Sequence, residues 1–422
     1  MLAPSSTRDW PLLPIVRAEG VYLYTADGRR IMDFTAGIGV TNVGHGHARV
    51  LAAAHEQMDK FSHSAVGLTL HEPLLRLSEE LPKVMPPGME MFFFGNSGSE
   101  AVEGALKLAR YVTRRPGIIA FEGGFHGRTY GAASVTSARS KYRLGYEPLV
   151  PGVYFAPYAY PYRCPFGEDD ATVVEWSLAE LQKVFDRFIA PSEVAAVLVE
   201  PVQGEGGYIV PPAEFLRSLR RICDEHGILL ILDEVQTGFG RTGQMFAAQV
   251  FQVRPDIMCV AKGIANGFPL SATVASRALM GRWLAGAHGT TFGGNPISCA
   301  AALATLDVIR EENLLENCCK MGARLLDGLQ TLQMEFPLIG DVRGVGLMAA
   351  IELIVPGQGK TPNPEAAMSV LENCLERGLL AYIAGLHRQV VRFMPPLNVT
   401  QAQVGEALSI LGESLAAACI SH

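Results

Sequence analysis

The sequence predicts an α/β protein whose larger domain is built on a doubly wound, mostly parallel sheet. Three apolar runs without alternation, at residues 194–199, 228–232 and 257–261, are typical of strands buried on both faces. A helical pattern over residues 212–226 separates the first two runs, and this strand-helix-strand order indicates a parallel sheet. Because 422 residues exceed one typical core, we also expect a smaller α/β domain.

The composition indicates a soluble enzyme and disfavours two classes of partner. Hydrophobic residues make up 49% of the chain and charged residues 18%, as in a well-packed globular protein. The net charge of −7 comes without a long basic block, which disfavours nucleic acid. No apolar run approaches the roughly 18 residues of a membrane span, and Pro4, Asp9 and Pro11 interrupt any signal-peptide core. The eight cysteines form no C-x-x-C pair, so we expect reduced thiols in a cytoplasmic protein.

The N-terminal part begins with a predicted hairpin. Its strands are residues 21–24 and 31–34, joined by a turn at Asp27-Gly28. His45 and His47 follow in a glycine-rich turn, and no third ligand has metal-binding spacing. We therefore interpret this turn as the entry to a helix. The next expected elements are helices over residues 48–61 and 72–85, a strand over 89–94, a helix over 100–112 and a strand over 118–121.

Small or polar side chains follow several of these strands. Ser97 and Glu100 fit the Ser-x-x-Glu capping box at the start of a helix, which makes an anion site because first-turn N–H groups lack partners. A plain helix cap is the alternative interpretation of these residues. After the strand over 118–121, one loop carries Phe125, His126 and Arg128, which we interpret as ligand contacts; a glycine-rich turn with a solvated arginine is the alternative. Residues 140–175, rich in proline and tyrosine, are expected to form a long irregular loop.

The strand-end residues Asp233 and Lys262 carry the strongest chemical signal. Ligand crevices of open α/β sheets lie at the carboxyl ends of the strands, so these side chains are expected to share a pocket. A lysine in an apolar pocket becomes a nucleophile toward an aldehyde. An aspartate at the far end of a pyridine ring keeps the ring nitrogen protonated, which makes the ring an electron sink. With a helix start for a phosphate, these parts describe a site for pyridoxal 5'-phosphate.

The C-terminal part is expected to form the smaller domain with the N-terminal segment. A long helical stretch over 297–332, with a break, leads to strands over 348–354 and 390–394. Residues 344–349 match G-x-G-x-x-A, but they open into a strand-like run, so a dinucleotide site is disfavoured. We expect residues 1–60 to belong to the small domain, 61–316 to form the large cofactor-binding domain, and 317–422 to complete the small domain.

Two segments of the chain resemble the signature of class III (omega) aminotransferases of the pyridoxal-phosphate fold type I. These are residues 231–243, which contain Asp233-Glu234-Val235-Gln236, and residues 261–272, which begin Ala261-Lys262-Gly263. The resemblance extends over nearly the whole chain and implies a homodimer, or a dimer of dimers, with shared active sites. It implies that Lys262 forms the internal aldimine and that Asp233 pairs with the pyridinium nitrogen. The other implied cofactor contacts are Ser97, Gly98, Phe125, His126, Glu200, Val235, Gln236 and, from the neighbouring subunit, Thr291.

The same resemblance implies a site for two kinds of substrate. Arg392, in Arg-x-x-Pro-Pro-Leu, would bind the α-carboxylate of glutamate, and Arg128 would take a second carboxylate. Glu205 would pair with Arg392 when the donor lacks an α-carboxylate, and Ile38 resembles an active-site isoleucine of 4-aminobutyrate aminotransferases. The expected reaction is ping-pong transamination from an omega-amino acid to 2-oxoglutarate, with no metal.

Several alternatives remain open at this stage. The acetylornithine and ornithine aminotransferases have similar patterns, and pyruvate is an alternative acceptor. A racemase or a decarboxylating enzyme of the same fold differs only in which bond aligns with the ring. An NAD-dependent oxidoreductase would depend on residues 344–349 alone. A non-catalytic binding protein would require Asp233 and Lys262 to coincide by accident.

Overall fold

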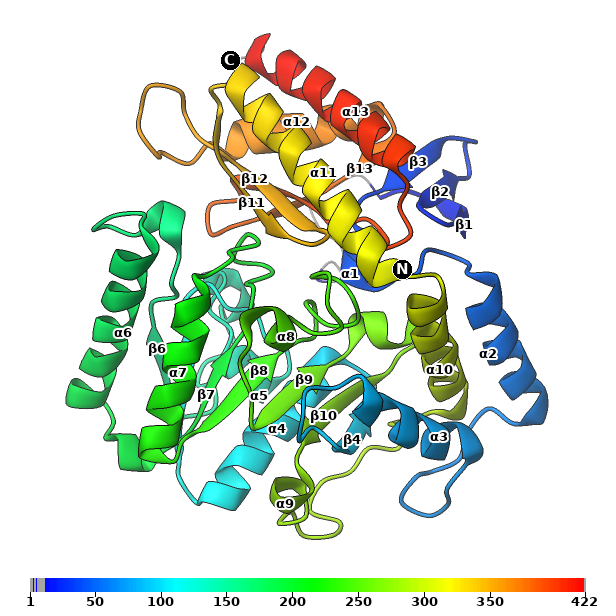
Figure 1. Ribbon diagram of the computed structural model, residues 1–422, viewed down its shortest axis with the longest axis vertical. Coiled ribbons are helices and arrows are strands. Elements are labelled where there is room, and N and C mark those ends of the chain that lie inside the picture. Colours follow the sequence, from blue (N-terminus) through cyan, green and yellow to red (C-terminus); the bar gives the residue numbers. More distant parts are fainter. Residues whose placement is uncertain (1–2, 4, 6–11, 421–422) are drawn as a thin grey trace.

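A computed structural model describes residues 3, 5 and 12–420 of the chain. The predicted doubly wound sheet is present as a seven-stranded sheet in the order β4-β10-β9-β8-β7-β5-β6 (Figure 1). β10 runs antiparallel to both of its neighbours, β4 and β9, and the other neighbouring strands are parallel. The strands are β4 (Met91–Gly95), β5 (Gly117–Phe121), β6 (Val153–Ala156), β7 (Val194–Val199), β8 (Leu229–Asp233), β9 (Ile257–Val260) and β10 (Ser271–Ala275).

The central strands are buried on both faces, which explains their uninterrupted apolar runs. Every residue of β5, β7, β9 and β10 is buried. One face packs against α4 (Gly98–Thr113), and the other packs against α6 (Asp170–Arg187) and α7 (Ala213–His226). Alternate strand residues therefore belong to two separate apolar clusters, one on each side of the sheet.

The smaller part of the fold lies at one side of the large sheet and contains two four-stranded sheets (Figure 1). In the first, β3 from the N-terminal segment pairs in parallel with β13 near the C-terminus, so both ends of the chain contribute to it. Its strands are β1 (Ile15–Glu19), β2 (Tyr22–Thr25), β3 (Arg30–Asp33) and β13 (Leu379–Leu380). The second contains β11 (Ile339–Val345), β12 (Met348–Leu353), β14 (Tyr382–Ala384) and β15 (Val390–Phe393). The proposed boundaries at residues 60 and 316 stay a prediction.

The remaining helices surround these sheets. The expected break in the long C-terminal helix occurs at Glu312 and Asn313, where Asn313 adopts a left-handed backbone conformation. The helices are α1 (Ala36–Gly39), α2 (Ala48–Lys60), α3 (Glu72–Glu80), α5 (Tyr130–Ser134), α8 (Ala247–Phe251), α9 (Arg277–Met280), α10 (Pro296–Glu311), α11 (Leu314–Glu335), α12 (Pro364–Glu376) and α13 (Gln401–Ile420). Short 3-10 segments cover Leu81–Lys83, Ser140–Tyr142, Pro161–Arg163, Pro191–Glu193 and Lys262–Ala265.

The structure corrects some sequence-based expectations. Residues 140–175 are not one irregular loop, because they contain β6 and the start of α6, which Asp169 caps by accepting a hydrogen bond from the Thr172 amide. The short edge strand β6 carried too few residues to show a pattern. The helix predicted over 72–85 ends at Glu80, and a 3-10 turn that includes Pro82 follows it. The sequence also did not predict β1 or β10.

Other expectations can be compared with local contacts. Residues 344–349 lie in the antiparallel hairpin of β11 and β12, which lacks the strand-to-helix turn of a dinucleotide site. His45 pairs with Asp33 at 2.8 Å and His47 with Glu312 at 3.0 Å. All eight cysteines are free thiols. Within the described part of the chain, no helix has the length and apolar character needed to cross a bilayer. Most of residues 1–11, on which the signal-peptide argument depends, lie outside the described residues.

Candidate active site

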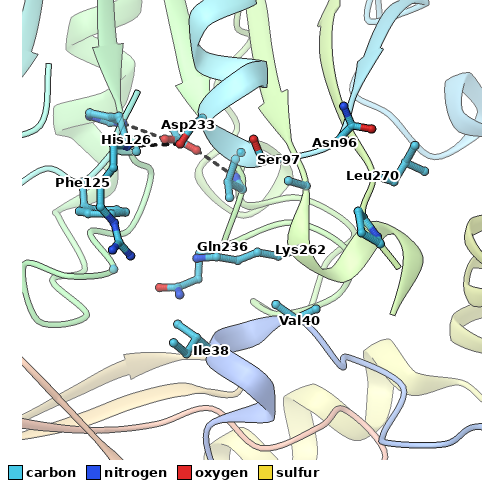
Figure 2. A pocket seen from close by; sticks show the side chains of 18 of the residues that line it. Ile38, Val40, Asn96, Ser97, Phe125, His126, Asp233, Gln236, Lys262 and Leu270 are labelled. Carbon is cyan, nitrogen blue, oxygen red and sulfur yellow. Dashed lines mark hydrogen bonds and ion pairs between the residues drawn. The ribbon is translucent and has the colours of Figure 1, made fainter. Parts of the chain in front are cut away.

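A cavity of about 450 Å³ lies at the carboxyl ends of the parallel strands, between the large sheet and the N-terminal segment (Figure 2). The loops that follow β4, β5, β7, β8 and β9 form most of its wall, and α1 adds Ile38. The cavity contains twelve of the fourteen residues predicted for the site. They are Ile38, Ser97, Gly98, Phe125, His126, Arg128, Glu200, Glu205, Asp233, Val235, Gln236 and Lys262.

Lys262 begins a short 3-10 segment directly after β9, and its side chain extends into the cavity (Figure 2). Its backbone φ is +46°, a left-handed conformation that strains a residue with a side chain. Removal from water and the charge of Arg392 lower the pKa of the Lys262 amine to about 8, although Asp233 opposes this shift. The geometry therefore presents an amine that is partly neutral near physiological pH.

The apoprotein should bind pyridoxal phosphate covalently in a pH-dependent manner that reports on Lys262. Only the neutral amine is nucleophilic, so the rate of covalent attachment should rise about tenfold per pH unit below the pKa. It should level off above pH 8, because the pKa of Lys262 is about 8 instead of the ordinary 10.5. Borohydride fixation followed by peptide mapping measures this rate. A rate that still rises steeply beyond pH 9 would contradict the lowered pKa.

Asp233 lies at the end of β8 and is held from two sides. Its Oδ2 is 2.7 Å from Nδ1 of His126, and its Oδ1 accepts a hydrogen bond from the Val235 amide at 3.1 Å. Burial alone would lower the pKa of His126, but the hydrogen bond and charge of Asp233 raise it above the ordinary value. The His126 amide in turn donates to Thr136 Oγ1 at 2.9 Å. The carboxylate is therefore fixed in the cavity wall, as a partner for a cationic ring nitrogen requires.

The start of α4 contains the predicted capping box. Ser97 Oγ accepts a hydrogen bond from the Glu100 amide at 3.3 Å, and Glu100 accepts one from the Ser97 amide at 2.8 Å, which completes the capping box. Gly98 and Ser99 line the cavity from the first turn of α4, where backbone N–H groups lack intrahelical partners. A Cβ at Gly98 would lie 2.9 Å from Val235 Cγ1, so only glycine allows this close approach.

Glu200 and Gln236 are two polar residues of the cavity wall. Glu200 accepts hydrogen bonds from the amides of Phe125 and Gly204, both at 2.8 Å, and burial raises its pKa to about 7. Gln236 is 8% exposed, and its Oε1 has no hydrogen-bond partner. This buried acceptor in the cavity wall fits a ring hydroxyl group, while Phe125 and Val235 offer apolar contacts for ring faces.

Arg392 and Thr291 are the two predicted residues that do not line the cavity. Arg392, on β15, is fully buried behind Glu205 and forms an ion pair with Glu205 Oε1. Thr291 is exposed in a loop before α10. Sequence reasoning missed other lining residues, among them Val40, Asn96, Ser99, Phe268, Pro269 and Leu270. Of these residues, Asn96 could have been predicted from the sequence, because it is a polar residue that directly follows the strand β4.

The whole chain is similar to known proteins of one family. The model of the family "Aminotransferase class-III" matches residues 4–415. The protein is a class-III aminotransferase. The chain is 40% identical over 403 residues to a probable 4-aminobutyrate aminotransferase from Bacillus subtilis (strain 168), covering 95% of this chain and 92% of that protein. It is 38% identical over 411 residues to an alanine/serine racemase from Pyrococcus horikoshii, covering 96% of this chain and 86% of that protein.

A solved structure supports the same assignment. An amine transaminase from an uncultivated Pseudomonas species, in its PLP-bound form, superposes with a TM-score of 0.92 at 33% identity, covering 99% of this chain and 96% of that chain. This aminotransferase therefore has the fold of the pyridoxal-phosphate-dependent transaminases, as predicted, and pyridoxal 5'-phosphate is its cofactor. The unpaired Gln236 acceptor and the close packing at Gly98 both fit that group.

Proposed function

We propose that this aminotransferase transfers the amino group of an omega-amino acid similar to 4-aminobutyrate to 2-oxoglutarate in a ping-pong reaction. The observation that carries the proposal is the buried pair of Glu205 and Arg392 beside the cavity, with Arg128 on the cavity wall. When bound, pyridoxal phosphate supplies the electron sink and carries the amino group between the two substrates. The alternative donors are acetylornithine and ornithine, and the alternative acceptor is pyruvate.

Arg392 has hydrogen-bond donors that Glu205 does not use. Its side chain is completely buried, yet Nε and Nη1 have no hydrogen-bond partner, because Glu205 accepts only from Nη2. The rings of Tyr382 and Tyr208 lie 4.7 Å and 5.4 Å from its guanidinium carbon, and the negative charge of Glu205 holds its pKa above the ordinary value despite burial. Unused donors on a buried guanidinium favour a second carboxylate at this position.

The ion pair provides a way to accept two kinds of substrate. A donor without an α-carboxylate meets an Arg392 whose charge Glu205 neutralises. Glutamate or 2-oxoglutarate brings a carboxylate that displaces Glu205 from Arg392. The second carboxylate of the dicarboxylic acids binds Arg128, an exposed residue whose guanidinium lies 5.8 Å from the ring centre of Phe125. We propose that Ile38 and Phe125 bound the space between these two ends.

The catalytic residues on this proposal are Lys262 and Asp233. Lys262 holds the cofactor between turnovers, and its amine then removes the proton from the donor carbon and returns a proton later in the cycle. Asp233 keeps the ring nitrogen protonated through its fixed negative charge. Ser97 and Gly98 bind the phosphate, and Glu200 and Gln236 border the ring. The roles of Phe125, His126 and Val235 are to clamp the ring and to hold Asp233 in place.

We further propose a homodimer in which Thr291 of the partner subunit completes the phosphate site. Thr291 is exposed, and Phe292 beside it is a 60% exposed aromatic residue. Thr290, the preceding residue, accepts a hydrogen bond from Asn96 Nδ2 at 3.2 Å, which keeps this loop close to the start of α4. A protein that is monomeric and fully active at high dilution would contradict this assembly.

Removal of the Glu205–Arg392 pair should selectively weaken the use of glutamate. In the double variant Glu205→Gln/Arg392→Met, which removes both charges of the pair together, the glutamate half-reaction should lose about 10²- to 10³-fold in kcat/KM, because two charge-assisted hydrogen bonds disappear. The half-reaction with 4-aminobutyrate should change by less than about threefold, since that donor does not use Arg392. Stopped-flow absorbance of the cofactor measures both half-reactions.

The exposed pair Glu214–Arg221 on α7 provides a matched control. Its double variant Glu214→Gln/Arg221→Met should behave like wild type with both substrates. Equal losses with glutamate and 4-aminobutyrate in the Glu205/Arg392 variant would argue against the dual-substrate site.

Racemisation is a second candidate function, favoured by the similarity to the alanine/serine racemase. Incubation of the holoenzyme with one amino acid and no keto acid distinguishes the two reactions. We expect the cofactor absorbance to change once and then stop, because the amino group has no acceptor. Continuous loss of optical activity in L-alanine or L-serine would instead identify a racemase.

A further inference from the structure

Glu205 lies in a buried network that contains a second arginine, Arg139. Arg139 is 9% exposed, and its Nε donates a hydrogen bond to the Gly385 carbonyl oxygen at 3.2 Å. The Gly385 amide donates to the Glu205 carbonyl oxygen at 3.0 Å. Gly385, in the loop between β14 and β15, therefore contacts both Arg139 and Glu205. Tyr142 OH donates to Glu205 Oε2 at 3.3 Å, and the Tyr142 amide donates to the Arg139 carbonyl oxygen at 3.2 Å. Arg139 therefore lies beside Glu205.

The charge of Arg139 has no carboxylate partner in the part of the chain that the structure describes. Its Nη2 is buried and makes no hydrogen bond. Burial lowers its pKa, while the nearby Tyr142 and Glu205 oppose that effect. Buried charges in proteins are normally paired, because the loss of hydration is otherwise uncompensated. The unpaired Nη2 of Arg139, close to Glu205, thus indicates that an anion binds Arg139 at one stage of the reaction.

We propose that Arg139 is the second counterion of Glu205 and receives its carboxylate when a substrate α-carboxylate occupies Arg392. This inference rests on the proposed function, because it requires Glu205 to leave Arg392. After the exchange both arginines have a carboxylate partner: the Glu205–Arg392 pair is replaced by a substrate–Arg392 pair and a Glu205–Arg139 pair. Without Arg139 the displaced carboxylate would be left in the protein without a cationic partner, a costly state.

Arg139 is on this argument a positioning residue that sets the balance between the two substrate classes. A donor without an α-carboxylate leaves Glu205 on Arg392 and makes no use of Arg139. A dicarboxylic acid requires the exchange, so part of its binding free energy is spent on moving Glu205. The Arg139 guanidinium reduces that cost, and it thereby allows one site to bind both substrates with useful affinity.

The test compares the two half-reactions in Arg139→Met, Arg139→Lys and wild-type holoenzyme. In Arg139→Met, the KM for glutamate should rise by about 10- to 100-fold, the range expected for loss of one charged hydrogen-bonded contact. The KM for 4-aminobutyrate should change by less than about threefold. Arg139→Lys, which keeps the charge, should recover much of the glutamate half-reaction. Arg143→Met, a change on the same turn at a residue that pairs with Glu147, is the matched control.

A double-mutant cycle with Glu205→Gln distinguishes a counterion role of Arg139 from a purely structural role. A neutral side chain at position 205 needs no counterion, so Arg139→Met should have no further effect on glutamate in that background. Binding of glutarate by calorimetry should follow the same pattern. A similar loss in both backgrounds, or equal losses for both substrates, would overturn the inference. If wild type does not use glutamate or 2-oxoglutarate at all, the proposed function fails instead.

Discussion

Replacement of Lys262 by alanine should reduce multiple turnover by at least about 10⁴-fold, because on the proposed function the variant loses both the covalent attachment and the proton-transferring amine. The cofactor should still bind, since the first turn of α4, the Asp233 carboxylate and the Gln236 acceptor remain in place. The visible spectrum should show pyridoxal phosphate that can be removed by dialysis. Steady-state kinetics and equilibrium dialysis measure the two effects separately.

Lys183→Ala is the control for this substitution. Lys183 is an exposed lysine on α6 that pairs with Glu180, and its loss should not change turnover measurably. A small external amine should restore part of the proton transfer to Lys262→Ala, because the cavity created there opens into the site. If Lys262→Ala retained multiple turnover at a rate near wild type, the assignment of Lys262 as the catalytic amine would be wrong.

The core of the fold was predictable because its signals are local. The strands β5, β7, β8 and β9 appear as continuous apolar runs, since both faces of the parallel sheet are covered by helices. The residues that follow such strands meet at one edge, so their convergence on a cavity also followed from the pattern. The capping box of Ser97 is likewise a short-range feature, and the structure contains both of its reciprocal hydrogen bonds.

The parts that could not be predicted depend on contacts between distant segments. The parallel pair β3–β13 joins Met32 with Leu379, and a two-residue strand leaves no periodic pattern. Glu205 and Arg392 are 187 residues apart, so neither signals the other, and only the family resemblance indicated their pairing. Arg139 was missed for the same reason. It is one of 35 basic residues by composition, and only the fold shows that it is buried beside Glu205.

Replacement of Asp233 by asparagine should reduce the rate of the first half-reaction by about 10³-fold, the usual scale for loss of a preorganised charge in a site. The neutral amide no longer stabilises a protonated ring nitrogen, so the ring withdraws electrons less strongly. His126 offers a second readout. Its pKa is raised by Asp233 against the effect of burial, so the pKa should fall in the variant, and the ring should be neutral where wild type holds it protonated.

Asp256→Asn makes the same chemical change at the opposite end of the sheet. Asp256 directly precedes β9 and accepts a hydrogen bond from the Leu230 amide of β8 at 2.8 Å. It pairs with Arg220 at 2.7 Å and does not line the cavity. Stopped-flow kinetics should show a large loss only for Asp233→Asn, and nuclear magnetic resonance of labelled histidine should show the shift of His126. An unchanged half-reaction together with a shifted His126 would mean that Asp233 only positions the histidine. A slow half-reaction of Asp233→Asn with bound cofactor, beside an unchanged Asp256→Asn, would place the charge of Asp233 in the chemistry, because the same loss of charge at the other end of these strands then has no effect.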